Sequence, residues 1–323
     1  MSNIFDLVII GGGPIGLNCA IEAKKAGLNY IILEKGVLVN SLYNFPTNMT
    51  FFSTSNLLEI GEVPFVAHND KPTRSESLEY FRRVVDSKDL NIALYTEVKS
   101  MRSDEGVYQI ETSKGAFYSE FIIVATGFYD VPRLLNIPGE SLPKVSHFYN
   151  DPHLLIGQKL LVIGAANSAC DVALEAYHKG AEVTMAIREE AIYAKVKYWI
   201  KPNIENRIKD GSIKAYFNTT VKEITQEEVL LNTPEGELTI QNDFVLAMTG
   251  YQPNYDLFES LGLAINNDEF RTPLHDPETL ETPLSQVYIA GVINAGLKTS
   301  TLFIENTRIH ADMIIKDILE KRS

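Results

Sequence analysis

Residues 7–35 read LVIIGGGPIGLNCAIEAKKAGLNYIILEK, and residues 160–188 read LLVIGAANSACDVALEAYHKGAEVTMAIR. The two stretches align without a gap at a constant offset of 153 residues, which pairs Gly11 with Gly164 and Gly27 with Gly180. In each copy, four apolar residues predict a strand that is buried on both faces of a parallel sheet. An amphipathic helix follows, and Gly27 or Gly180 ends it. The repeat therefore predicts two βαβ units in an α/β protein.

The first copy carries the pattern Gly-x-Gly-x-x-Gly between its strand and its helix. We expect Gly11 to permit a tight turn, Gly13 to let the backbone approach a pyrophosphate, and Gly16 to let the helix pack closely on the strand. Glu34 ends the second strand, where a carboxylate can accept hydrogen bonds from a ribose diol. This context favours a dinucleotide site over a glycine-rich structural turn.

The second copy has a less regular turn after Gly164. Ala166 and Ala169 replace the second and third glycines. These small residues keep the turn compact, but their methyl groups narrow the space through which a pyrophosphate would approach the backbone. Asn167 and Ser168 can add side-chain hydrogen bonds to a phosphate. We expect a second nucleotide to bind here.

The residues after the second strand of this copy indicate which nucleotide that is. Ile187 stands at the position of Glu34, so the ribose carboxylate is missing, and Arg188 follows directly. An arginine can bind a 2′-phosphate that a carboxylate would repel, which favours NADPH over NADH. Lys195 and Lys197 are further candidates. The alternative is that Arg188 and these lysines are ordinary surface charges.

The rest of the chain predicts an inserted domain. FIIVATG at 121–127 and FVLAMTG at 244–250 predict two similar strands, each at a domain junction, and VYIAG at 287–291 predicts another strand. We expect a discontinuous first domain, residues 1–127 and 250–323, with residues 128–249 inserted. The pattern from Thr299 to Lys316 predicts a helix with Thr299, Ser300 and Thr301 as capping candidates.

Composition excludes several classes of protein. With 29 basic and 42 acidic residues in 323, the net charge of −13 opposes binding to nucleic acid or to anionic membranes. No run of 18 apolar residues appears, so we expect a soluble, cytoplasmic protein. Two cysteines cannot build a disulfide framework, and the six histidines are scattered, so no metal site is expected.

Several motifs together identify a family resemblance. GGGPIG at 11–16 with Glu34, ATG at 125–127, GAANSA at 164–169 and YIAG at 288–291 resemble the low-molecular-weight thioredoxin-reductase-like flavoproteins. More narrowly, the chain resembles the YpdA-type bacillithiol-disulfide reductase family. The stretches that carry this likeness are YNFPTNMTFFSTS at 43–55, EVPF at 62–65, Lys201-Pro202-Asn203, and AGVINAG with FIEN within 290–306.

The resemblance implies two Rossmann-like domains, with FAD in the outer domain and NADPH in the inserted domain. Hydride would pass from NADPH to the flavin N5, so no catalytic side chain is assigned. The residues implied for FAD are Gly11, Gly13, Pro14, Ile15, Gly16, Glu34, Lys35, Ser41, Asn44, Val98, Ala125, Thr126, Gly127, Gly291, Val292 and Thr301. Those implied for NADPH are Gly164, Ala166, Asn167, Ser168, Arg188 and Lys195.

The chain departs from the resembled families at two places. Gly291-Val292 replaces the Gly-Asp of thioredoxin reductases, a change that the narrower family shares. Ile15 stands where the narrower family carries a cysteine in the first glycine loop. Cys19 and Cys170 lie in the two helices of the repeat, where we expect them to be inert core residues.

These features favour an NADPH-dependent FAD oxidoreductase. It would reduce a small acceptor, such as a free flavin, a quinone or a ferric chelate, without an enzyme thiol. One alternative is a reductase of a low-molecular-weight thiol disulfide of the bacillithiol type. Another is a ferredoxin or flavodoxin NADP reductase, whose partner would be a small redox protein. A non-enzymatic alternative is a flavoprotein that senses NADPH. We expect a homo-oligomer.

Overall fold

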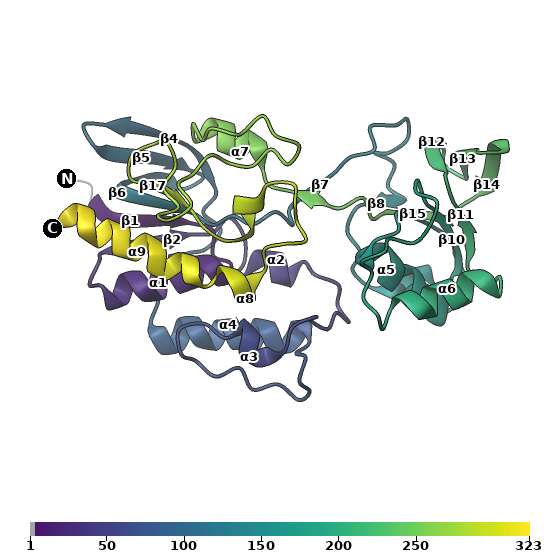
Figure 1. Ribbon diagram of the computed structural model, residues 1–323, viewed down its shortest axis with the longest axis horizontal. Coiled ribbons are helices and arrows are strands. Elements are labelled where there is room, and N and C mark those ends of the chain that lie inside the picture. The colour runs from purple at the N-terminus through teal and green to yellow at the C-terminus, as the bar shows by residue number, and fades with distance from the viewer. Residues whose placement is uncertain (1–3) are drawn as a thin grey trace. The chain divides into compact units, whose positions relative to one another are not determined.

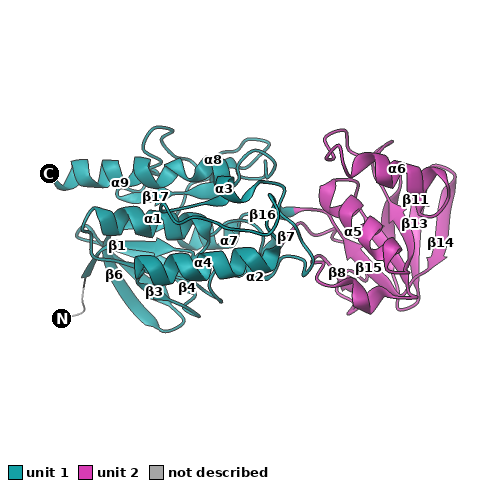
Figure 2. Ribbon diagram, turned by 90° about the horizontal axis from the view of Figure 1, so that it is seen from below, with its two compact units in different colours: residues 1–131, 251–323 teal, residues 132–250 magenta. Residues whose placement is uncertain are grey.

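The computed structural model describes residues 4–323 and divides the chain into two compact units. Unit 1 comprises Met1–Val131 and Tyr251–Ser323, and unit 2 comprises Pro132–Gly250 (Figure 2). The second unit is therefore inserted into the first. The two connecting segments pair as short strands, β7 (Val131–Pro132) and β16 (Tyr251–Gln252).

Unit 1 is built on a seven-stranded sheet in the order β3-β2-β1-β6-β5-β4, with β17 also paired to β6 (Figure 1). The strands β3, β2, β1, β6 and β17 are parallel, whereas β5 and β4 run antiparallel to their neighbours. The strands are β1 (Ile4–Ile10), β2 (Tyr30–Leu33), β3 (Ile92–Ala93), β4 (Val98–Asp104), β5 (Val107–Thr112), β6 (Gly115–Val124) and β17 (Val287–Ile289).

Helices of very different lengths accompany this sheet. The helix α4 begins at a capping box, in which Thr73 and Glu76 bind each other's backbone N–H groups. The helices are α1 (Pro14–Lys25), α2 (Asn40–Tyr43), α3 (Ser55–Leu58), α4 (Arg74–Lys88), α7 (Tyr255–Ser260), α8 (Ile304–Thr307) and α9 (Ile309–Arg322), with a 3₁₀ turn, η2, at Gly291–Ala295.

The alternation of side chains along β1 assigns the two faces of the unit 1 sheet. Leu7 and Ile9 pack in the core that contains α1, α4 and α9, and α1 lies beside α9 in Figure 1. Val8 and Ile10 pack on the other face, with the β4–β5 hairpin and α7. Both faces of β1 are therefore covered, which explains why its apolar residues form a continuous run.

Unit 2 repeats this plan with a five-stranded parallel sheet in the order β11-β10-β9-β15-β8. A separate antiparallel sheet, β12-β13-β14, completes the unit. The elements are β8 (Val145–Ser146), a 3₁₀ turn η1 (Pro152–Leu155), β9 (Lys159–Ile163), α5 (Asn167–His178), β10 (Glu182–Ala186), α6 (Lys201–Lys209), β11 (Lys214–Tyr216), β12 (Thr220–Ile224), β13 (Glu228–Thr233), β14 (Gly236–Gln241) and β15 (Phe244–Ala247).

The side chains of β9 alternate between the two faces of their sheet in the same way as those of β1, the equivalent strand of the repeat. Leu160 and Val162 pack with α5 and α6, whereas Leu161 and Ile163 pack against the three-stranded sheet. The expected α/β fold with one Rossmann-like unit inserted in another is confirmed.

The unit boundaries differ slightly from the expected ones. The structure keeps residues 128–131 with unit 1 and places Gly250 in unit 2. Phe128, Tyr129 and Asp130 line a pocket of unit 1, and Tyr129 packs on Phe45 with ring centroids 4.6 Å apart. These contacts explain why the segment after Gly127 belongs to the first unit.

The prediction of a helix from Thr299 was wrong at its N-terminus. Thr299 to Thr301 form a turn, and α8 begins at Ile304. The side chain that caps it is Asn306, whose Oδ1 accepts a hydrogen bond from Phe303 N (2.7 Å) while its Nδ2 donates to Thr301 O (2.8 Å). The helix could not extend backward because the backbone of Phe303 is extended.

Among the described residues 4–323, the structure contains no helix that is long and apolar enough to cross a membrane.

Candidate dinucleotide sites

The glycine turn between β1 and α1 has the geometry expected for a pyrophosphate site. Gly11 has a φ of +110°, and a Cβ there would lie 2.6 Å from the Ala125 carbonyl oxygen. A Cβ on Gly16 would lie 1.9 Å from the Gly11 carbonyl oxygen, so only glycine lets the helix pack this closely on the turn. A Cβ on Gly13 would meet nothing within 4 Å. The space over Gly13 is therefore open to a ligand.

Glu34 is held in this turn by backbone donors. Its Oε2 accepts a hydrogen bond from Gly12 N (2.7 Å), and its Oε1 accepts one from Gly36 N (2.9 Å). The residue is 6% exposed, and burial raises its pKa, although the two backbone N–H groups oppose that shift. Each oxygen keeps a second lone pair, so Glu34 can still accept a hydrogen bond from a ribose hydroxyl.

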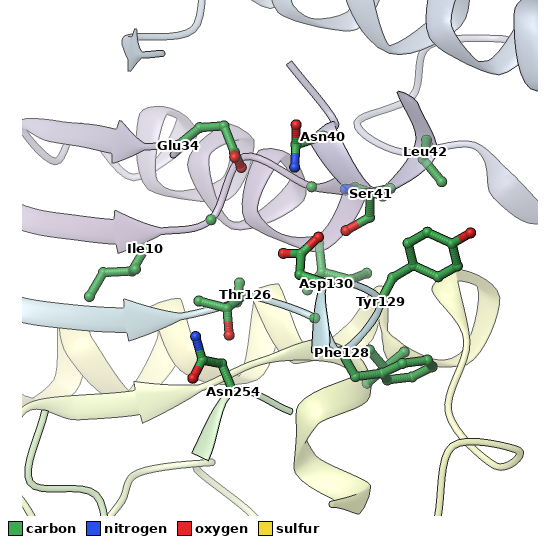
Figure 3. Close-up of a pocket in the computed structure, with 18 of the residues that line it drawn as sticks. Ile10, Glu34, Asn40, Ser41, Leu42, Thr126, Phe128, Tyr129, Asp130 and Asn254 are labelled. Carbon is green, nitrogen blue, oxygen red and sulfur yellow. The ribbon is translucent and has the colours of Figure 1, made fainter. Parts of the chain in front are cut away.

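A pocket of about 670 Å³ in unit 1 starts at this turn. Its size lies within the range of small-molecule and cofactor sites. In Figure 3, Glu34, Asn40 and Ser41 line one side of it, and Thr126 and Asn254 line the other. The residues expected to bind FAD that line this pocket are Gly11, Gly13, Pro14, Ile15, Glu34, Lys35, Ser41, Val98, Ala125, Thr126, Gly127, Gly291 and Val292.

One orphaned polar atom shows that this pocket suits a polar ligand. Thr126 Oγ1 is buried, and no hydrogen-bond partner for it exists among the described residues. Leaving a buried hydroxyl unpaired costs about 1–3 kcal/mol, which a ligand atom would recover. With the open space over Gly13 and the carboxylate of Glu34, the pocket has the features that a flavin dinucleotide needs.

Three residues expected to bind FAD do not line the pocket. Gly16 lies beneath the turn, against Gly11. The Asn44 side chain donates to Asn40 O (2.8 Å), and Asn40 lines the pocket in its place. The Thr301 hydroxyl donates to Lys298 O (2.8 Å), and the neighbouring Leu302 and Phe303 line the pocket because α8 begins later than expected.

The pocket wall contains an aromatic group that was not predicted from the sequence. Tyr129 packs edge-on against Phe45, and its ring centroid lies 4.5 Å from that of Tyr251. Burial raises the pKa of Tyr129 and keeps its hydroxyl protonated. The segment FYD directly after Gly127 was the available signal, because residues after the end of a parallel strand face the ligand crevice.

Lys35 and Asp130 form an ion pair beside the pocket, with Nζ and Oδ2 2.7 Å apart. Lys35 directly follows Glu34, so the pair links the end of β2 to the loop after β6. The positive charge of Lys35 is therefore already compensated by a carboxylate of the same pocket.

His310 supports the backbone of Gly291, where the pocket meets η2. The Gly291 N–H donates to His310 Nδ1 (3.0 Å), so the neutral ring carries its proton on Nε2. Burial lowers the pKa of His310 to about 4, and His275 adds to that shift. Protonation of Nδ1 would remove the acceptor on which the Gly291 backbone depends.

In unit 2, the expected NADPH residues lie around the turn from β9 to α5. Gly164 has a φ of +125°, and a Cβ there would lie 2.7 Å from Met248 O. Ala166 is the N-cap of α5, and Ser168 in its first turn is exposed. Asn167 Oδ1 accepts a hydrogen bond from Lys197 N (2.9 Å), which leaves only its amide N–H groups for a phosphate.

Arg188 follows β10 with a side chain that is 80% exposed. Its guanidinium pairs with Glu189 at 2.8 Å. Lys195 is exposed as well, and the backbone around it is tied to the turn because Tyr193 N donates to Ala165 O (3.1 Å). The structure thus places both cations near the α5 turn, with a carboxylate competing for Arg188.

Both cysteines are buried free thiols with 0% exposure. Burial raises the pKa of Cys19 to about 12, with Asp312 adding to the effect. Burial also raises the pKa of Cys170 to about 12, and its Sγ lies 3.6 Å from Ala165 O. Since the thiolate is the nucleophile in disulfide exchange, neither cysteine is suited to it.

Residues 4–323 contain no group of three or more His, Cys, Asp or Glu side chains arranged to hold a metal ion.

Comparisons with known proteins identify relatives that match nearly the whole chain. Residues 8–291 match the family model described as pyridine nucleotide-disulphide oxidoreductase. Bacilliredoxin reductase Bdr of Bacillus subtilis (strain 168) is 42% identical over 318 residues, covering 98% of each chain. The solved structure of bacillithiol disulfide reductase Bdr (YpdA) from Staphylococcus aureus has a TM-score of 0.96 and 40% identity over 100% of both chains. The crystal structure of T. acidophilum thioredoxin reductase shares the fold, with a TM-score of 0.77, 21% identity and 99% coverage of both chains.

The first prediction concerns Gly13→Ala. The backbone there has a φ of −77° and open space, so alanine fits the protein itself, and only a bound pyrophosphate would meet the new methyl group. We expect the wild type to be yellow with one FAD per chain, and the variant to bind FAD about 1–3 kcal/mol more weakly. Flavin absorbance and a FAD titration measure this. Gly16→Ala is the contrasting variant, which should damage folding. Unchanged FAD affinity in Gly13→Ala would place the pyrophosphate elsewhere.

The second prediction concerns His310 and acid stability. The pKa falls from 6.5 in the unfolded chain to about 4 in the folded protein, so the unfolded state binds more protons between these values. Stability should therefore decrease as the pH falls through this window, by about 2 kcal/mol between pH 7 and pH 5 from this residue. His310→Asn keeps an acceptor for Gly291 N but does not titrate. Urea unfolding at both pH values should show a smaller loss for the variant; equal losses would refute the assignment.

Proposed function

The chain belongs to the pyridine nucleotide-disulphide oxidoreductase family and uses FAD and NADPH, and we propose that it reduces the disulfide of a low-molecular-weight thiol. The overall reaction is NADPH + H⁺ + RSSR → NADP⁺ + 2 RSH. The likeness to proteins named for bacilliredoxin and bacillithiol disulfide, which extends over the whole chain at 40–42% identity, supports this acceptor class. This observation carries the proposal.

The FAD site is proposed in the pocket of unit 1. Gly13 would face the pyrophosphate, Glu34 would accept a hydrogen bond from the adenosine ribose, and Thr126 would pair its buried hydroxyl with the flavin part. When bound, FAD accepts hydride from NADPH and passes the electrons to the acceptor. The aromatic wall of Phe45 and Tyr129 would exclude water from one side of the pocket.

The NADPH site is proposed at the α5 turn of unit 2. The exposed N-terminus of α5 offers backbone N–H groups to the pyrophosphate, with Ser168 beside them. Asn167 would contribute an amide N–H while its Oδ1 holds Lys197 N. Arg188 and Lys195 would bind the 2′-phosphate, since both are exposed cations near this turn.

A second candidate function follows from the thiols. The cysteine that the resembled family carries after the loop proline is Ile15 here, and this side chain packs against Gly291 in the pocket. Cys19 and Cys170 are fully buried, with pKa values raised to about 12. This observation favours transfer of electrons to an acceptor without an enzyme thiol, such as a free flavin, a quinone or a ferric chelate.

An acceptor panel tests both candidates on one sample. NADPH oxidation is followed with small disulfides, free flavin, a quinone and a ferric chelate, and the release of free thiol is measured separately. Thiol release at two per NADPH would support the disulfide reductase. Turnover with the other acceptors and no thiol release would refute it in favour of the second candidate.

The third prediction is that Cys19→Ala with Cys170→Ala leaves turnover nearly intact. Both thiols are buried and mostly protonated, so neither lies on the electron path. Removing packed sulfur atoms costs stability, so FAD content and unfolding are measured beside the rate. A double variant that keeps FAD and its reduction by NADPH, yet loses acceptor turnover, would show that an enzyme thiol is required.

The fourth prediction is that Arg188→Ala raises the KM for NADPH but not for NADH, since only NADPH carries the 2′-phosphate. The guanidinium is largely exposed, which limits its contribution, so we expect a rise of about 5-fold. Glu189→Gln is the matched control. It frees Arg188 from its carboxylate and should lower the KM for NADPH or leave it unchanged. An equal rise for both nucleotides in Arg188→Ala would show that the arginine does not read the 2′-phosphate.

A further inference from the structure

One part of the pocket wall in unit 1 opens to solvent through aromatic side chains. Phe52 and Phe303 line the pocket and are 39% and 43% exposed. Phe52 belongs to the loop before α3, and Phe303 directly precedes α8; α3 packs beside α8. We call the wall formed by Phe51, Phe52, Ser53, Phe303 and Glu305 the aromatic mouth. A molecule that enters here meets apolar rings and one carboxylate.

The carboxylate of the aromatic mouth is that of Glu305. The Ser53 hydroxyl donates to Glu305 Oε1 (2.8 Å), which holds the carboxylate at the pocket wall. Within the described part of the chain, Glu305 Oε2 accepts no hydrogen bond, and no cation forms an ion pair with Glu305. Nearby cations have other contacts: Arg308 donates to Glu59 O (2.7 Å), and Lys298 lies over the Phe270 ring at 5.5 Å.

The other carboxylates that line the pocket either have hydrogen-bond or ion-pair partners or lie in another part of its wall. Glu34 accepts two backbone N–H groups, and Asp130 pairs with Lys35. Glu97 directly precedes β4, and Asp256 lies in α7, which packs beside β4, so both belong to another part of the wall. Glu305 is thus the negative charge that an entering acceptor meets beside the exposed phenylalanines.

We propose that the aromatic mouth is the acceptor subsite and that Glu305 selects disulfides carrying an ammonium group over anionic ones. The inference rests on the proposed function and narrows its substrate class. An ammonium group would bind the open Oε2 in a charge-assisted hydrogen bond, while the carbon chain and the disulfide lie on the phenylalanine rings. An anionic acceptor would be repelled by the same oxygen, and the net charge of −13 adds to that repulsion.

The test compares two disulfides of similar length and opposite charge. Cystamine carries two ammonium groups, and 3,3′-dithiodipropionate carries two carboxylates. The wild type should show the higher kcat/KM for cystamine. In Glu305→Gln, the ratio of the two kcat/KM values should fall by about 3- to 10-fold, mainly through the KM for cystamine. An unchanged ratio would overturn the proposal.

Two control variants separate this local effect from other causes. Glu269→Gln removes an exposed carboxylate that does not line the pocket, so it changes the net charge equally and should leave the ratio unchanged. Glu305→Asp keeps the charge and should retain the preference for cystamine. Loss of the preference in Glu305→Asp as well, with FAD content intact, would show that packing rather than charge is responsible and would refute the proposal.

A second acceptor pair distinguishes failure of this inference from failure of the proposed function. If the wild type releases no thiol from these two disulfides or from any other small disulfide of the acceptor panel, the disulfide reductase is refuted. The wild type and Glu305→Gln are then compared with hexaammineruthenium(III) and ferricyanide as acceptors, because both accept single electrons and have opposite charges. Glu305→Gln should lower the rate with the cation relative to the anion. No change in this ratio would overturn the role of Glu305 independently of disulfide chemistry.

Discussion

The helix α1 lies directly on the turn that precedes it because Gly16 has no side chain to separate it from the Gly11 carbonyl oxygen. Any Cβ at Gly16 would lie 1.9 Å from that oxygen. This contact places the N-terminus of α1 at the end of β1, and Glu34 fixes the turn from the other side through Gly12 N. The pocket depends on this arrangement, because its floor is the turn itself and its walls are the loops that follow β2 and β6.

The βαβ unit occurs twice in the chain, but the polar groups around its turn have different partners in the two copies. In both copies the first strand divides its side chains between a helical core and a second layer, so the repeat preserves both faces of the sheet. In unit 1, Gly13 and the orphaned Thr126 hydroxyl remain open to a ligand. In unit 2, part of Asn167 and the Arg188 guanidinium are engaged by Lys197 N and Glu189. The first site is therefore the more fully prepared for a ligand.

Local patterns made the fold, and the glycine turn at the candidate site, predictable from the sequence. The repeat, the buried strands and the glycine turn depend on residues that are close in sequence, and they lie where expected. The start of α8 did not follow this rule, because its capping residue is Asn306 rather than a threonine before the helix. Asn44 does not line the pocket for a related reason: one turn of α2 places Asn40 and Ser41 at the pocket, and the Asn44 side chain donates to Asn40 O. Contacts such as Ser53 with Glu305 join residues far apart in the chain, and no local pattern indicates them.

The position of Ile15 connects the missing thiol with the shape of the acceptor region. Ile15 is 7% exposed and packs against Gly291, so its branched side chain occupies the pocket wall where a cysteine would offer a sulfur atom. Cys19, four residues along α1, is fully buried in the core. An acceptor in this pocket would therefore have to approach the flavin itself rather than a protein sulfur atom. Under that constraint, side chains at the opening, rather than an enzyme nucleophile, would determine which acceptors react, and Glu305 is the charged side chain placed there.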